Sequence, residues 1–122
     1  MRVVVARHAG VCYGVQRALE IAEREAAAGG PVVTYGPLIH NPQAVARLRE
    51  QGVEVAATLD DVPTGTLIIR SHGVDPAVIT EAESRGLSVV DATCPFVKAA
   101  HRCAADLVQA GLAVVIVGES DH

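Results

Sequence analysis

The sequence predicts an α/β fold in which a parallel four-stranded sheet is flanked by helices. Short runs rich in valine and isoleucine alternate with segments whose apolar residues recur at helical spacing. Such an alternation implies parallel strands joined by right-handed crossovers. The core composition agrees, because half of the residues are hydrophobic while only 2% are aromatic. Aliphatic side chains must therefore fill the interior, as is usual for buried parallel strands.

Local signals place the individual elements. Apolar residues from Val15 to Ala26 recur at helical spacing, and Gly29-Gly30-Pro31 ends this first helix. Asn41-Pro42 and Asp75-Pro76 each combine an N-cap residue with a proline at the first helical position. Strands are predicted at residues 2–6, 32–34, 53–55, 66–70, 88–91 and 112–117, and helices at about 15–28, 42–51, 76–85 and 95–110.

The predicted elements suggest a domain boundary near Cys94-Pro95. A complete α/β unit precedes this point, so we predict a first α/β domain over residues 1–94 and the start of a second over residues 95–122. The chain ends just after a predicted strand, where an α/β protein would ordinarily continue. We therefore expect it to be a fragment of a longer protein.

Charge and hydropathy exclude several classes of function. The net charge is −4 and no run of Lys or Arg forms a basic stripe, which argues against a nucleic-acid surface. The longest wholly apolar run, residues 112–117, is too short to span a bilayer. No secretory signal is visible at the N-terminus. We expect a cytoplasmic protein with neither a nucleic-acid nor a membrane partner.

Cysteines and histidines gather at one predicted edge of the sheet. In an open parallel sheet, ligands bind outside the carboxyl ends of the strands. The residues at or just beyond those ends are Cys12, His40, His72, Cys94 and His122. Cys103 lies about half a turn around the last predicted helix from Cys94, so we assign it to core packing. His101 falls on the exposed side of that helix and receives no role.

The residue types at this edge favour a metal beside an anion. Cys12 and Cys94 each immediately precede a predicted helix, and helix N-termini favour the thiolate form that binds metal. His40 and His72 precede N-cap signals, where backbone N–H groups attract phosphate or carboxylate. Alternatively, the cysteines are inert small hydrophobes and the histidines are solvated loop residues. Arg7 and Arg70 could also meet an anion or be ordinary surface residues.

Five segments together resemble the LytB-type 4-hydroxy-3-methylbut-2-enyl diphosphate reductases. Any one of them is weakly specific, whereas five in order are highly specific. They are AGVCYGVQRA (9–18), YGPLIHNP (35–42), RSHGV (70–74), VDATCPFV (90–97) and VGESDH (117–122), which resemble a first cysteine motif, two histidine motifs, a second cysteine motif and the start of a third histidine motif.

The resemblance implies a fold, a reaction and a set of site residues. The family forms a trefoil of three similar α/β domains around a central [4Fe–4S] cluster, and this chain would be the first domain plus the first helix and strand of the second. The reaction removes the allylic hydroxyl of (E)-4-hydroxy-3-methylbut-2-enyl diphosphate and yields isopentenyl and dimethylallyl diphosphates in the non-mevalonate pathway. Cys12 and Cys94 match two of the three cluster ligands. His40, His72 and His122 match histidines that contact the substrate, chiefly around its diphosphate.

The sequence also departs from the complete family pattern. The third cysteine ligand is absent, because Cys103 has neither its position nor its context, and the proton-delivering glutamate is expected beyond residue 122. No catalytic residue is therefore assigned here, and the chain alone is expected to lack a stable cluster and activity. The resemblance further implies ferredoxin or flavodoxin as electron donor, and a full-length enzyme that is a monomer or a weak dimer.

Two other functions remain open from the residues themselves. The chain could be a non-enzymatic α/β module that binds a small phosphorylated ligand through His40, His72 and helix N-termini. It could also hold a structural zinc ion between Cys12, Cys94 and two histidines. Iron and sulfide content separates the reductase from both alternatives, and zinc content separates these from each other.

Overall fold

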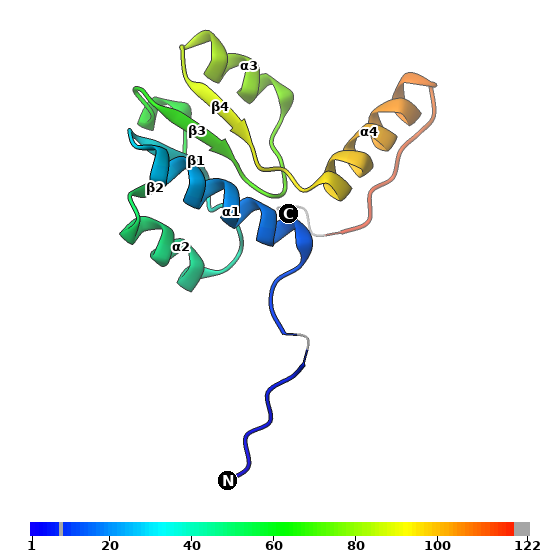
Figure 1. The fold of residues 1–122 in the computed structure, drawn as a ribbon. Helices are drawn as coiled ribbons and strands as arrows, with labels where there is room; N and C mark the ends of the chain where they lie inside the picture. The colour runs from blue at the N-terminus through cyan, green and yellow to red at the C-terminus, as the bar shows by residue number, and fades with distance from the viewer. Residues whose placement is uncertain (8, 119–122) are drawn as a thin grey trace.

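The computed structural model of the chain describes residues 1–7 and 9–118 (Figure 1). Helices and strands alternate along the chain, as the sequence predicts. The elements are α1 (Tyr13–Ala28), β1 (Val32–Tyr35), α2 (Pro42–Glu50), β2 (Val53–Ala56), the 3-10 turn η1 (Leu59–Asp61), β3 (Thr66–Ile69), α3 (Pro76–Ser84), β4 (Ser88–Asp91) and α4 (Pro95–Gln109).

The four strands form one parallel sheet in the order β2-β1-β3-β4. The register is regular: Val32 lies opposite both Val53 and Thr66, and Thr66 lies opposite Ser88. The predicted α/β fold with a parallel four-stranded sheet is therefore confirmed. All four strands end at the same edge of the sheet, and the polar loops that follow them meet there.

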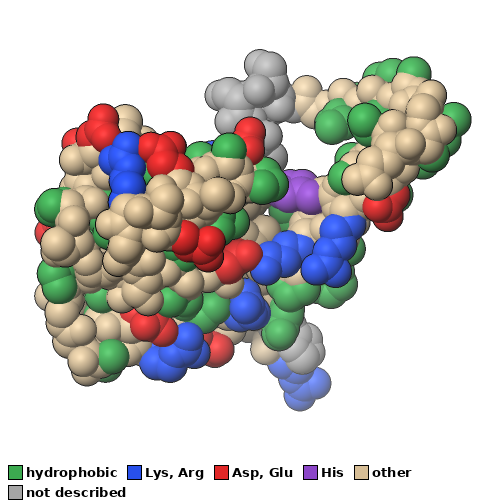
Figure 2. Space-filling view, turned by 90° about the horizontal axis from the view of Figure 1, so that it is seen from above, with side chains coloured by type: hydrophobic (Ala, Val, Ile, Leu, Met, Phe, Trp, Pro, Cys, Tyr) green, Lys and Arg blue, Asp and Glu red, His purple; other side chains and the backbone are tan. Residues whose placement is uncertain are grey.

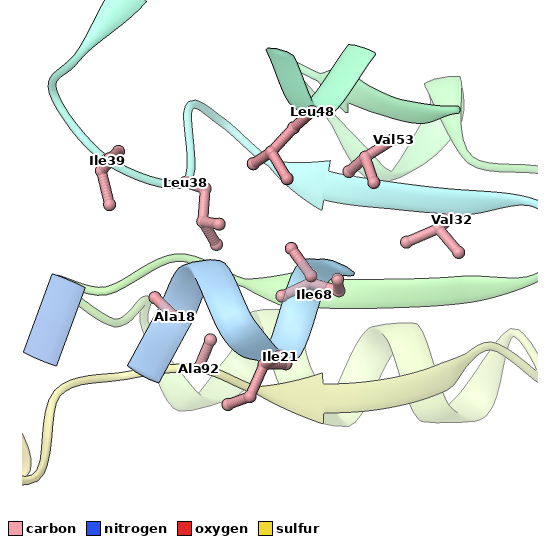
Figure 3. Close-up of a cluster of buried hydrophobic side chains, with 10 residues drawn as sticks. Ala18, Ile21, Val32, Leu38, Ile39, Leu48, Val53, Ile68 and Ala92 are labelled. Atoms are coloured by element: carbon pink, nitrogen blue, oxygen red, sulfur yellow. The ribbon is translucent and has the colours of Figure 1, made fainter. Parts of the chain in front are cut away.

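Two hydrophobic clusters sandwich the sheet. Ile68 points to the face covered by α1 and α2, whereas its neighbours Leu67 and Ile69 point to the face covered by α3 and η1. The first cluster, shown in Figure 3, consists of Ala18, Ile21, Ala22, Val32, Leu38, Ile39, Leu48, Val53, Ile68 and Ala92. Ile68 is completely buried. Burial of a side chain of this size stabilises the fold by about 2 kcal/mol.

The strands predicted at residues 2–6 and 112–117 are not formed. Val3, Val4 and Val5 are 74%, 76% and 82% exposed, and Figure 1 shows the N-terminal segment leading away from the sheet. Residues 112–117 follow α4 as an irregular and largely exposed segment. A valine-rich run has the local propensity for a strand, but a strand also needs a neighbouring chain to bond its backbone. Neither segment lies in the sheet, whose edge strands are β2 and β4.

Helix α4 differs from the other helices because none of its residues is buried. Figure 1 shows it projecting away from the sheet, and Phe96 near its start is 74% exposed. Cys103 is exposed as well, so its assignment to core packing is wrong. The sequence predicts an apolar face on α4, but the spacing of apolar residues does not show whether this face packs against the sheet domain. No helix of the described residues is both long and apolar enough to cross a membrane.

Candidate functional site

Backbone hydrogen bonds continue past the strands at their carboxyl edge. The amide of Ser71 donates to the carbonyl of Leu38 at 3.2 Å, and the amide of Cys94 donates to the carbonyl of Ser71 at 2.9 Å. These bonds place the segments that follow β1, β3 and β4 side by side in one row. His40, His72 and Cys94 therefore lie on adjacent chain segments although they are far apart in the sequence.

The rings of His40 and His72 are brought together at this edge. Their centroids lie 4.5 Å apart and the ring planes are inclined by 37°. His40 lies just before α2, where the Asn41 side chain caps the helix by accepting a hydrogen bond from the amide of Ala44 at 3.0 Å. The pair of imidazoles thus stands beside the N-terminus of α2, where the helix dipole favours an anion.

The two cysteine thiols line one cavity of about 180 Å³. Cys12 is the N-cap residue of α1 and Cys94 is the N-cap residue of α4, and neither side chain makes a capping hydrogen bond. Cys12 is exposed and Cys94 is half-buried. The cavity is lined by Cys12, Gly14, Val15, Ser71, His72, Cys94 and Val97. Both thiols and one imidazole therefore face the same space.

The backbone of Thr93, the residue before Cys94, is hydrogen-bonded to the side chains of Asp91 and Arg17. Its amide donates to Asp91 Oδ1 at 2.8 Å, and its carbonyl accepts from Arg17 Nη1 at 3.3 Å. Asp91 also pairs with Lys98 on α4, with Oδ2 and Nζ 2.5 Å apart. Burial raises the pKa of Asp91, but the hydrogen bonds from Lys98 and Thr93 outweigh this effect and hold the pKa below its ordinary value. The loop that carries Cys94 is thereby tied to both α1 and α4.

Arg70 holds the turn that carries His72. Its Nε donates to the carbonyl of Gly73 at 3.3 Å, and the amide of Gly73 donates back to the carbonyl of Arg70 at 3.0 Å. The sequence suggests Arg70 as an anion ligand or a surface or salt-bridge residue and gives no sign of this contact. Arg7 lies in the exposed segment before α1.

His101 was given no role from the sequence, yet it lies against the His72 turn. A Cβ atom built on Gly73 would stand 3.0 Å from Cε1 of His101. His101 follows Cys94 by about two helical turns, so both residues lie on one side of α4. This spacing is the sequence feature from which the position of His101 near the site could have been predicted. Figure 2 shows histidine surface at the junction between the body of the sheet and α4. His122, predicted to contact the substrate, lies outside the described residues.

Nearly the whole chain matches one protein-family model. The family model described as LytB protein matches residues 3–122. The chain belongs to the LytB family. The family resemblance carried by the five sequence motifs is thereby confirmed.

Curated relatives agree with this membership. A protein of Geotalea uraniireducens, named 4-hydroxy-3-methylbut-2-enyl diphosphate reductase, is 48% identical over 122 residues, which are 100% of this chain and 43% of that protein. A protein of Pelobacter propionicus with the same name is also 48% identical, over 100% of this chain and 44% of its own length. The chain thus spans less than half the length of these relatives.

Solved structures of the family share the fold. A solved structure of (E)-4-hydroxy-3-methyl-but-2-enyl diphosphate reductase, described as the terminal enzyme of the non-mevalonate pathway, superimposes with a TM-score of 0.83 at 44% identity, covering 98% of this chain and 43% of that one. The E-1-hydroxy-2-methyl-but-2-enyl-4-diphosphate reductase of Plasmodium falciparum gives a TM-score of 0.89 at 29% identity, covering 93% of this chain and 36% of that one.

The described part of the LytB chain does not assemble a complete metal site. Within residues 1–7 and 9–118, no three or more His, Cys, Asp or Glu side chains are grouped so that they could hold a metal ion. What the fold does provide is a pair of thiols on one cavity, beside a pair of imidazoles at a helix N-terminus.

Proposed function

We propose that this chain forms part of a 4-hydroxy-3-methylbut-2-enyl diphosphate reductase and supplies two cysteine ligands and two diphosphate-binding histidines to its site. The observation that carries the proposal is the single cavity lined by Cys12, Cys94 and His72, with the ring of His40 lying against that of His72. The curated relatives that cover the whole chain bear this enzyme's name. The activity is the reductive removal of the allylic hydroxyl, which yields isopentenyl and dimethylallyl diphosphates.

The thiols fit an iron–sulfur cluster. Cys12 and Cys94 are both at helix N-termini, where the positive end of the dipole stabilises the negative charge of a thiolate–iron group. Two thiols are too few for a cluster, and Cys103 lies on the exposed helix α4, so the third cysteine ligand would come from outside this sequence. A [4Fe–4S] cluster with three cysteine ligands supplies electrons and one open, Lewis-acidic iron for the substrate hydroxyl.

The imidazoles fit the diphosphate end of the substrate. His40 and His72 can donate N–H hydrogen bonds to phosphate oxygens, and the positive end of the α2 dipole lies beside them. This mode of binding needs no large basic patch, and the face in Figure 2 shows acidic and basic side chains interspersed. His122 would be a third substrate contact. The proton-delivering glutamate would lie beyond residue 122, so no catalytic residue is assigned to this chain.

We also propose that residues 1–94 form the first domain of a three-domain trefoil and that residues 95–122 begin the second. The absence of any buried residue on α4 supports this boundary, because α4 adds nothing to the core of the sheet domain. The complete enzyme would be a monomer or weak dimer that takes electrons from ferredoxin or flavodoxin. A cytoplasmic location is consistent with Cys12, Cys94 and Cys103 being free thiols.

An anaerobic absorption spectrum with iron and acid-labile sulfide assays tests the proposal. The measurement is made on this chain and on a version extended to the length of its relatives. We expect a brown extended protein with about four irons, and loss of that iron in Cys12→Ser and Cys94→Ser. Cys103→Ser is the matched control and should keep it. The 122-residue chain alone is expected to hold no stable cluster and to turn over no substrate.

The same assays decide between the proposal and its alternatives. A colourless extended protein after anaerobic reconstitution would contradict the cluster. Stoichiometric zinc in its place would favour a structural zinc site, and pyrophosphate binding without either metal would favour a non-enzymatic binding module.

A further inference from the structure

Gly14 occupies the first turn of α1, where its backbone does not require glycine. The positive-φ glycines of the described chain do not include Gly14, which has ordinary helical geometry. Glycine is a poorer helix former than alanine. A reason other than backbone conformation must therefore account for glycine at this position.

That reason is the Cys94 side chain, which lies directly on the Gly14 backbone. A Cβ atom built on Gly14 would stand 2.5 Å from Sγ and 2.9 Å from Cβ of Cys94. Both distances are far shorter than a carbon atom tolerates from a nonbonded neighbour. Gly14 is buried and lines the same cavity as Cys12 and Cys94.

We propose that Gly14 is a positioning residue: its missing side chain admits Cys94 to the start of α1 and thereby sets the separation of the two thiols. Cys12 immediately precedes α1, so any shift of the first turn also moves its thiol. The inference rests on the proposed function only in naming an iron–sulfur cluster as the group that the paired thiols hold.

A methyl group at position 14 cannot be accommodated by rotating the Cys94 side chain alone. Rotation about the Cα–Cβ bond would remove Sγ from the contact but would leave Cβ in place. The Cys94 backbone is itself held, because its amide donates to the carbonyl of Ser71 at 2.9 Å and the preceding carbonyl, of Thr93, accepts from Arg17 Nη1 at 3.3 Å. The start of α1 must therefore move away, and Cys12 moves with it.

Thiol bridging tests this geometry without any metal. Dibromobimane becomes fluorescent when both of its bromides are displaced, so its signal reports two thiols close enough to be alkylated by one reagent molecule. The reaction is run on the reduced 122-residue chain carrying Cys103→Ser, in which Cys12 and Cys94 are the two remaining thiols. We expect Gly14→Ala to slow bridging at least tenfold. Single alkylation of each thiol by iodoacetamide, measured by peptide mass spectrometry, should change much less.

Iron content separates this inference from the proposed function. In the protein extended to the length of its relatives, Gly14→Ala should lose most of the iron that the parent holds. If the parent bridges its thiols but takes up no iron, the cluster proposal fails while the positioning role of Gly14 stands. If Gly14→Ala bridges as fast as the parent, or if the parent does not bridge, the positioning role is overturned.

A second pair of variants keeps the test decisive if Gly14→Ala folds poorly. Cys94→Gly removes both Cys94 atoms that a methyl group at position 14 would strike, and glycine is acceptable at an N-cap position. In that background Gly14→Ala should raise the urea midpoint of unfolding, because alanine favours the helix. In the parent it should lower the midpoint. Equal shifts in both backgrounds would show that Gly14 and Cys94 are not coupled and would overturn the inference.

Discussion

The ring of His40 lies against the ring of His72, with their centroids 4.5 Å apart, although the two residues follow different strands. The contact arises because β1 and β3 are neighbours in the sheet, with Val32 opposite Thr66, and because the amide of Ser71 donates to the carbonyl of Leu38 beyond the strands. A parallel sheet thus converts two separate loops into one surface.

This pairing predicts that both histidines contribute to diphosphate binding. His40→Ala and His72→Ala should each weaken the binding of inorganic pyrophosphate about tenfold, or about 1.4 kcal/mol, because each removes a hydrogen-bond donor to a charged group. Isothermal titration of the protein at the length of its relatives measures the effect. Gln43→Ala, an exposed change in the first turn of α2, is the control and should bind as the parent does. Unchanged binding in both histidine variants would contradict the proposed site.

The His72 turn should tolerate no side chain at Gly73. Gly73 and Gly86 both have φ of +80°, but a Cβ on Gly73 would meet His101 Cε1 at 3.0 Å and Thr93 Cγ2 at 3.2 Å, whereas a Cβ on Gly86 would meet nothing within 4 Å. Gly86→Ala should cost about 1–2 kcal/mol for the left-handed backbone alone. Gly73→Ala should cost about 1 kcal/mol more because of the crowding. Urea unfolding measures both free-energy costs. Equal costs would contradict the crowding, because they would mean that the side chains of His101 and Thr93 move aside without loss of stability.

The ion pair between Asp91 and Lys98 should make stability depend on acid pH. The pKa of Asp91 is lower in the folded protein than its ordinary value of 3.8. Its contribution is therefore fully present above that value and is lost as pH falls through the folded pKa. We expect Asp91→Ala to cost about 1 kcal/mol at neutral pH, since the pair is partly exposed.

Urea unfolding of the parent and Asp91→Ala, measured from about pH 7 down to about pH 3, checks this prediction. The difference between the two unfolding free energies should shrink only near the acid end. Asp91→Asn is an informative control because its side-chain oxygen can still accept from the amide of Thr93. A difference that stays constant over the whole range would mean that ionisation of Asp91 does not matter.

Arg17 should stabilise the loop that carries Cys94. Its Nη1 donates to the carbonyl of Thr93 at 3.3 Å and so links α1 to this loop. Arg17→Met keeps the aliphatic stem but removes the donor. It should cost about 1 kcal/mol of unfolding free energy and should speed alkylation of Cys94. Arg24→Met is the matched control on the same helix, because Arg24 pairs with the adjacent Glu25 in an exposed position. Equal effects of the two changes would contradict a specific role for Arg17.

Local signals in the sequence were sufficient for much of the fold. Asn41-Pro42 and Asp75-Pro76 mark the starts of α2 and α3, and both capping side chains accept the expected backbone hydrogen bonds. Cys12 and Cys94 are the N-cap residues of α1 and α4, immediately before the helices as predicted. These features depend on interactions within a few residues, so they can be predicted from a short stretch of sequence.

The sequence predictions that are wrong concern segments whose packing partners the sequence does not reveal. The valines at residues 3–5 have strand propensity, and α4 has an apolar face, but propensity does not show whether a partner segment covers them. The exposure of Cys103 and the unformed strands at 2–6 and 112–117 follow from the absence of such partners among the described residues.

The sequence by itself determined the parallel α/β architecture, the helix starts and the edge of the sheet at which thiols and imidazoles gather. Only the tertiary structure decided that the ring of His40 lies against that of His72, that His101 covers Gly73, and that Gly14 makes room for Cys94. The physical reason is the range of the interactions. Capping and periodicity act within one turn of the chain, whereas these contacts join segments that become neighbours only when the strands pair.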